Sequence, residues 1–344
     1  MRTGSERRVL VVGGYGHVGL KIAERLTTQG AATCRLAGRD LQRAQAAATR
    51  LGGEAVRLDL SDPATWSAAL DGVDAVVVCT DQDDLAFVSE VVARGLVYVD
   101  ITADDGFLRR VEGLDAAAAA SGAEVVLSVG LSPGLTNLLA AACARGLDRI
   151  DRAQICVLLG LGDSHGVAAV DWMMRQVRQA DPWTLETRAV EVPWSGRPWP
   201  AVAFPFADQF VVARTLGAPR TETLLTFDSA WVSRLVFTVF RKFGRSPALG
   251  RIARAAVGKV RIGSDRAAVA VEVHGLRDGR PVEVRAGLDG RREADITARV
   301  AALTVERLLG QEPLAGVRHL HQVLVLEDFA EDLAEQGVAL TPPG

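Results

Sequence analysis

The chain has 344 residues, of which 49% are hydrophobic and 24% are charged, and its formal net charge is −3. This composition suits a globular protein with a full core, and the charge gives no reason to expect a nucleic-acid partner. The length favours two domains. Because Met1–Arg8 is polar and no run of 18 apolar residues exists, we expect no signal peptide and no transmembrane helix, and hence a cytoplasmic protein. The four cysteines lack metal-binding spacing, so we expect buried thiols in a reducing compartment.

The most informative segment joins an apolar run, Val9–Val12, to the pattern Gly14-x-Gly16-x-x-Gly19 and then to an amphipathic stretch. This order predicts a strand, a glycine turn and a helix, as in a dinucleotide-binding fingerprint. The glycines allow a tight turn, a close approach of the backbone to a pyrophosphate, and close packing of helix on strand. Amides of the first helical turn would then face the phosphates. We expect nucleotide contacts from the residues of this turn, Gly14, Tyr15, Gly16, His17 and Val18.

The second predicted strand, Ala32–Ala37, leads into Gly38-Arg39-Asp40. An NAD enzyme usually places a carboxylate about here for the ribose 2′-hydroxyl, whereas an arginine suits the 2′-phosphate of NADP. We therefore expect Gly38 and Arg39 to contact the cofactor and NADP(H) to be preferred. NAD(H) is the alternative if Asp40 binds the ribose, but we prefer to interpret Asp40 as the N-cap of the following helix, Leu41–Leu51.

Strand-like and helix-like segments alternate up to about residue 140, which predicts an α/β fold with a doubly wound parallel (Rossmann) sheet. Ligands bind beyond the carboxyl ends of such strands. Asp59 suits either a contact to adenine or a helix entry, and Cys79 and Thr80 suit either the ribose and nicotinamide or ordinary strand-end roles. Asp100 lies inside an apolar strand, and since a buried carboxylate is costly unless it is paired, we expect it to face the site.

Four blocks of sequence together resemble the saccharopine dehydrogenase/reductase family. They are Gly-Gly-Tyr-Gly-His-Val-Gly at 13–19, Ala-Gly-Arg at 37–39, Tyr-Val-Asp-Ile-Thr at 98–102 and Gly-Leu-Ser-Pro-Gly-Leu-Thr-Asn at 130–137. The segment 294–302 is also similar to the family's returning helix. The resemblance implies a Rossmann domain, a mixed α/β substrate domain, and NAD(P)-dependent chemistry on secondary amines and imines.

The middle of the chain, residues 141–293, is expected to form an inserted mixed α+β domain for substrate binding or dimerisation. The dinucleotide-binding domain would then comprise residues 1–140 and 294–344. A hairpin over Val269–Gly287, turning at Asp278-Gly279, is the clearest element of the insertion. The helix Ile296–Leu309 and a last helix at Asp328–Gln336 are expected to return to the first domain, and a strand is expected between them at Val323–Leu326.

Hydride transfer needs a polarising donor and often a proton relay. His165 is the best-placed histidine, because it follows Asp163 and Ser164 at a predicted strand-to-helix turn, although a simple capping turn would explain it equally well. Our candidate catalytic residues are His165, Asp100 and Ser132. No pair of carboxylates or histidines has convincing metal-ligand spacing, so we expect no metal.

Together these features predict an NADP(H)-dependent oxidoreductase that acts on a C=N or C–N bond of a small molecule derived from an amino acid or an amine. Two alternatives remain open. The same cofactor could serve the reduction of a C=O or C=C bond, or the chain could be a non-catalytic NADP-binding regulator.

One stretch has a lopsided charge, because residues 229–264 contain eight lysines and arginines and no acidic residue. Its apolar residues Trp231, Leu235, Val239, Phe240 and Phe243 have helical spacing, and Arg234, Arg241 and Arg245 share another face. A basic lid over an anionic substrate and a helix on a membrane surface are two interpretations. We prefer a solvated helix or part of a dimer contact, and so expect a homodimer without membrane contact.

Overall fold

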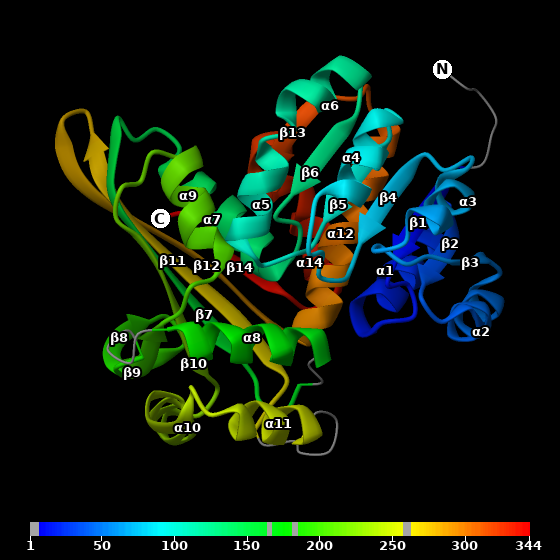
Figure 1. The fold of residues 1–344 in the computed structure, drawn as a ribbon. Coiled ribbons are helices and arrows are strands. Elements are labelled where there is room, and N and C mark those ends of the chain that lie inside the picture. Colours follow the sequence, from blue (N-terminus) through cyan, green and yellow to red (C-terminus); the bar gives the residue numbers. More distant parts are fainter. Residues whose placement is uncertain (1–6, 164–166, 181–184, 257–262) are drawn as a thin grey trace. The chain divides into compact units, whose positions relative to one another are not determined.

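The computed structural model describes residues 7–163, 167–180, 185–256 and 263–344 (Figure 1). The chain forms two compact units, one made of Met1–Gly134 and Asp295–Leu324, the other of Leu135–Ala294 and Val325–Gly344. Each unit contains a seven-stranded sheet. The expected α/β class, with a parallel Rossmann-like sheet and a second mixed domain, is confirmed.

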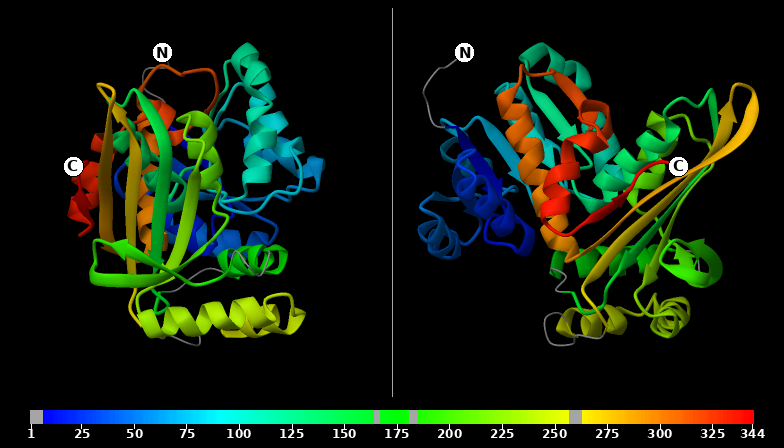
Figure 2. Two further views of the ribbon diagram at one scale, coloured as in Figure 1. Left: turned by 90° about the vertical axis from the view of Figure 1, so that its left-hand side faces the viewer. Right: turned by 180° about the vertical axis from the view of Figure 1, so that it is seen from behind.

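The first unit is a parallel sheet with the strand order β13-β6-β5-β4-β1-β2-β3. Helices cover both faces of this sheet (Figures 1 and 2). The strands are β1 (Arg8–Val12), β2 (Thr33–Gly38), β3 (Glu54–Arg57), β4 (Ala75–Val78), β5 (Val97–Asp100), β6 (Glu124–Leu127) and β13 (Gly316–His319). The helices are α1 (His17–Thr28), α2 (Leu41–Leu51), α3 (Trp66–Leu70), α4 (Ala86–Ala93), α5 (Asp105–Glu112), α6 (Asp115–Ser121), α12 (Glu293–Gly310) and α13 (Leu320–Val323).

The central strands of this sheet are short apolar runs because parallel strands are buried on both faces. All of Val9–Val12 and Ala75–Val78 is buried. Chain order reverses at β1, which has β2 on one side and β4 on the other. Such a switch point opens a crevice at the carboxyl end of the sheet where dinucleotides bind in this topology. The glycine turn follows β1 at this place.

The second unit has a mixed sheet with the order β14-β12-β11-β7-β10-β9-β8, in which only β7 and β10 pair in parallel. The strands are β7 (Arg149–Leu159), β8 (Arg188–Val192), β9 (Ser195–Ala203), β10 (Thr221–Phe227), β11 (Arg266–Arg277), β12 (Arg280–Arg291) and β14 (Ala339–Thr341). The helices are α7 (Thr136–Ala144), α8 (Val167–Gln179), α9 (Ala207–Thr215), α10 (Ala230–Phe243), α11 (Pro247–Ala256) and α14 (Ala330–Glu335).

The predicted hairpin is present as β11 and β12. Its two-residue turn has positive φ at both positions, 53° at Asp278 and 71° at Gly279, which matches the twist of the paired strands. Most of the described tryptophans of this unit are core or half-buried. Trp172 packs against Phe204 and Phe206 with ring centroids 5.7 and 5.4 Å away.

Two expectations near the C-terminus were wrong. The strand expected at Val323–Leu326 is absent, because Val323 ends the helix α13 and Leu326 begins a 3-10 helix. The strand after the long helix is Gly316–His319, which pairs with β6. Residues 325–344 were assigned to the first domain but lie in the second unit, because β14 pairs with β12 and Phe329 and Leu333 are buried. A short terminal strand of three residues carries little local pattern, so its pairing depends on tertiary packing.

Within the described residues, every helix is too short or too polar to cross a bilayer.

Candidate functional site

The glycine turn after β1 is packed around a single carbonyl oxygen, that of Gly13. The Gly16 N–H donates to this oxygen at 2.8 Å. A Cβ on Gly19 would lie 2.4 Å from the same oxygen, and a Cβ on Gly16 would lie 2.9 Å from it. Gly13 itself has φ +76°, which favours glycine. The close packing predicted for Gly19 therefore has a direct steric basis. The helix α1 begins at His17, and its first-turn N–H groups lack helical acceptors.

The carboxyl end of β2 carries the residues expected to select the cofactor. The Tyr15 ring lies against Gly38, where a Cβ would be 2.4 Å from Cε1 of the ring. Arg43 lies over the ring at 4.6 Å, and the Tyr15 hydroxyl accepts from the Asp40 N–H at 3.2 Å. Asp40 caps α2 by accepting from the Arg43 N–H at 3.1 Å, which confirms the preferred interpretation of this residue.

Arg39 is exposed beside this cap, and its guanidinium makes no hydrogen bond within the described part of the chain. It interacts with Asp59 only as a nearby charge. A guanidinium at the end of β2 can donate two parallel hydrogen bonds to a phosphate.

Asp59 and Thr80 follow β3 and β4 as expected, but the Asp59 carboxylate binds a neighbouring residue of its own loop. One oxygen, Oδ1, accepts from the Ser61 N–H at 3.1 Å and the Ser61 hydroxyl at 2.7 Å, which lowers the pKa of Asp59. This geometry is the helix-entry role that was the alternative to a contact with adenine. Thr80 is exposed.

Asp100 at the end of β5 is the most unusual group of the first unit. It is 1% exposed and accepts hydrogen bonds from the Tyr98 hydroxyl at 2.5 Å, Gln82 Nε2 at 3.0 Å and the Thr102 N–H at 2.7 Å. Burial raises the pKa of Asp100 to about 6, although the bonds from Tyr98 and Thr102 oppose the rise. A carboxyl group with this pKa can hold or release a proton near neutral pH.

Two partners of Asp100 were not anticipated. Tyr98 lies two residues earlier on β5, so the alternation of side chains along a strand could have identified it. Gln82 gives no such signal, because it lies in the loop after β4; its Nε2 also donates to the Tyr98 hydroxyl at 2.7 Å. Cys79, at the end of β4, has a pKa raised by burial and by the nearby Asp100 carboxylate, so its thiol stays neutral.

Two further catalytic candidates, His165 and Ser132, stay predictions. His165 lies outside the described residues. Ser132 is half-buried in the loop between β6 and α7. This loop is fixed to α12, because the Leu131 N–H donates to Thr297 Oγ1 at 3.1 Å and a Cβ on Gly130 would lie 3.2 Å from Thr297 Cγ2.

A serine after β6, a histidine at the end of β13 and a glutamate at the end of α5 form a chain of hydrogen bonds. Ser128 Oγ lies 2.8 Å from His319 Nδ1, and His319 Nε2 lies 2.9 Å from Glu112 Oε1. Ser128 has φ 60° and is 0% exposed. This chain of hydrogen bonds joins the edge strand β13 to the end of β6 and to α5, and we assign it a structural role.

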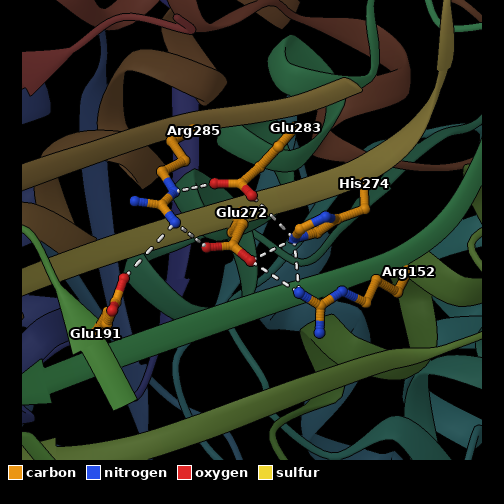
Figure 3. Close-up of polar contacts among 6 residues, drawn as sticks. All are labelled: Arg152, Glu191, Glu272, His274, Glu283 and Arg285. Atoms are coloured by element: carbon orange, nitrogen blue, oxygen red, sulfur yellow. Dashed lines mark hydrogen bonds and ion pairs between the residues drawn. The ribbon is translucent and has the colours of Figure 1, made fainter. Parts of the chain in front are cut away.

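The hairpin of the second unit carries a polar cluster (Figure 3). One ligand atom each from Glu272, His274 and Glu283 lie within 4.8 Å of one another, a spacing that could hold a metal ion. However, Arg285 pairs with Glu272 at 3.0 Å and with Glu283 at 2.5 Å, and Arg152 pairs with Glu272 at 3.1 Å. These guanidinium groups already neutralise the carboxylates, so we assign no metal to the cluster.

Comparison with known proteins agrees with this geometry. Residues 13–181 match a family model described as NAD(P)H-binding, and no curated protein matches the chain. Apo saccharopine dehydrogenase (L-Glu forming) from Saccharomyces cerevisiae superposes with a TM-score of 0.69 and 14% identity, over 97% of this chain and 99% of that chain. The fold and the NAD(P)H-binding region expected from the family resemblance are thereby confirmed.

Two further structures superpose more loosely. C. glutamicum DAP dehydrogenase in complex with DAP has a TM-score of 0.49 and 18% identity, over 96% of this chain and 99% of that chain. An engineered D-amino acid dehydrogenase bound to NADP+ has a TM-score of 0.47 and 18% identity, over 94% and 98%.

We expect Gly19→Ala to weaken binding of NADPH and NADH at least about tenfold, which is about 1.4 kcal/mol. The new methyl group would collide with the Gly13 carbonyl and displace the turn. Titration of nicotinamide fluorescence measures the effect. Gly196→Ala is the matched control, because a Cβ there meets nothing within 4 Å. Unchanged affinity in the Gly19 variant would show that nucleotides bind elsewhere.

The raised pKa of Asp100 predicts a pH-dependent stability. Since the folded pKa is about 6 and the ordinary value is 3.8, the protonated carboxyl group is favoured in the folded protein. Relative to Asp100→Asn, the wild type should lose up to about 3 kcal/mol of unfolding free energy as the pH rises from about 4 through about 6. Denaturant unfolding over this range measures the difference. Parallel curves would contradict it, and Asp278→Asn, at an exposed turn, serves as the control.

Proposed function

We propose that this chain, which has the fold of saccharopine dehydrogenase and an NAD(P)H-binding region, is an NADP(H)-dependent oxidoreductase. Its reaction would be hydride transfer at a C=N or C–N bond of a substrate derived from an amino acid or an amine. The observation that carries the proposal is the placement, at one edge of one sheet, of a glycine turn fit for a dinucleotide and a buried carboxyl group with a pKa near neutrality.

The strand order supports a direction for the bound cofactor. The glycine turn and the first turn of α1 would hold the pyrophosphate, with Gly14, Gly16, His17 and Val18 contributing backbone. The adenosine half would extend toward β2, where Arg39 would bind the 2′-phosphate. The nicotinamide half would extend toward β4 and β5, past Cys79 and Thr80. When bound, this cofactor supplies or accepts the hydride.

The protein itself would supply or accept the proton that the reaction requires. Reduction of an imine needs one proton as well as a hydride, and oxidation of an amine releases one. Asp100 would hold this proton at Oδ1 or Oδ2, with Tyr98 and Gln82 as positioning residues that fix the carboxyl group. General acid or base catalysis of this kind contributes roughly 10² to 10⁴ in rate.

The specificity for NADP(H) is tested with Arg39→Asp. We expect the variant to weaken NADPH binding about a hundredfold while NADH binding changes less than about threefold, because the guanidinium would pair only with the 2′-phosphate. Nucleotide titrations measure both constants, and Arg277→Asp on the exposed hairpin controls for net charge. Equal losses of affinity for NADPH and NADH would contradict the assignment of Arg39 to the 2′-phosphate.

The bond specificity is tested with a panel of 2-oxo acids mixed with amines, isolated ketones and enoyl compounds, by following NADPH oxidation. We expect turnover only where an imine can form. Asp100→Asn should lower kcat at least about a hundredfold and leave NADPH affinity within about twofold. Turnover of ketones or enoyl compounds alone would reassign the reaction, and NADPH binding without turnover of any class would favour a regulator.

A further inference from the structure

The helices α10 and α11 of the second unit are anchored by one side only. Ser233, Phe237 and Phe240 are buried, and the Ser233 hydroxyl accepts from the Phe227 N–H of β10 at 3.2 Å. Arg254 of α11 pairs with Asp171 of α8. In Figures 1 and 2 both helices lie at the outer end of the unit, beyond α8. The expected single apolar stripe is therefore split, because Phe240 faces the core while other apolar residues face outward.

The two helices carry the four most exposed large apolar side chains in the described part of the chain. Trp231 is 69% exposed, Ile252 65%, Phe243 59% and Leu235 49%. Trp231 and Leu235 are four residues apart, so they are neighbours on one face of α10. Scattered single apolar residues are ordinary on a protein surface, but four in two successive helices form a candidate interaction site.

The charged residues of the same two helices are all basic. Arg234, Arg241, Lys242, Arg245 and Arg251 are exposed, and none forms an ion pair with another described residue. No acidic residue occurs between Asp228 and Asp265. Arg234 and Lys242 share the face of Trp231 and Leu235, being three and eleven residues after Trp231. Cations thus surround the apolar side chains without any compensating carboxylate in the segment.

We propose that this face of α10 and α11 docks on membranes that contain anionic lipids. Apolar side chains flanked by lysine and arginine on an interfacial helix suit the boundary between headgroups and acyl chains, and anionic headgroups complement the unpaired cations. We replace our preference from sequence alone for a solvated helix or a dimer contact, because large apolar side chains are exposed and a second copy of this face would bring like charges together. The proposal is independent of the proposed catalytic function.

The test is cosedimentation of the full chain with vesicles of phosphatidylcholine alone or with about 30% phosphatidylglycerol. We expect binding at least about tenfold tighter to the anionic vesicles, weakening several-fold between about 0.1 M and 0.5 M salt. The double variant Arg241→Gln, Lys242→Gln and the variant Leu235→Ser should each lose most of this binding. Their matched controls are Arg277→Gln with Arg280→Gln, and Leu314→Ser, whose side chain is 47% exposed in the wild type.

Absence of binding to anionic vesicles by the folded protein, with folding checked by circular dichroism, would overturn the proposal. So would equal losses in the variants and in their controls. Sedimentation velocity without lipid gives the remaining outcome: a dimer that dissociates in Leu235→Ser but not in Leu314→Ser would show that a second copy of the chain covers the face instead. A wild-type protein whose mass is unaffected by Leu235→Ser supports membrane docking.

Discussion

The close approach of backbone to backbone around the Gly13 carbonyl is the constraint on which the nucleotide site depends. At the two helix-entry glycines, Gly16 and Gly19, a Cβ would collide with this oxygen. Any side chain there would push α1 away from β1, and the amides at the start of α1 would no longer face the space beyond the strand. The same turn is tied to the neighbouring strand, because the Gly13 and Gly14 N–H groups both approach the Ala37 carbonyl, at 2.9 and 3.2 Å. One set of packing contacts thus fixes both the glycine turn, where we propose that the phosphates bind, and the end of β2 that carries Arg39.

Asp100 shows two opposing effects on one carboxyl group. Burial disfavours the charged form, whereas three donors favour it. Burial outweighs the donors, and the pKa settles near 6 rather than at an extreme. For the Tyr98 hydroxyl the two largest effects act in the same direction, because burial and the adjacent carboxylate both raise its pKa. The tyrosine therefore stays a hydrogen-bond donor throughout the range in which Asp100 titrates.

Sequence reasoning succeeded where a local pattern determines a local structure. The glycine spacing, the apolar parallel strands, the Asp40 cap and the Asp278-Gly279 turn all follow from rules that act over a few residues. It failed where distant segments decide the outcome. The pairing of Gly316–His319 with β6 and of Ala339–Thr341 with β12 has no local signature, and the contact of Gln82 with Asp100 depends on a loop. The face to which each apolar residue of α10 points also required the neighbours of the helix.

The discontinuity of the first unit has a consequence for how the protein is made. Its edge strand β13 is joined to β6 by the pair Ser128 and His319, which are 191 residues apart in the chain. Until the ribosome has delivered residue 319, β6 is an unprotected edge whose backbone groups could pair with another strand. The intervening second unit must emerge in the meantime. High contact order of this kind slows folding, so the nascent first unit would benefit from a chaperone or from transient cover of β6 by its own downstream chain.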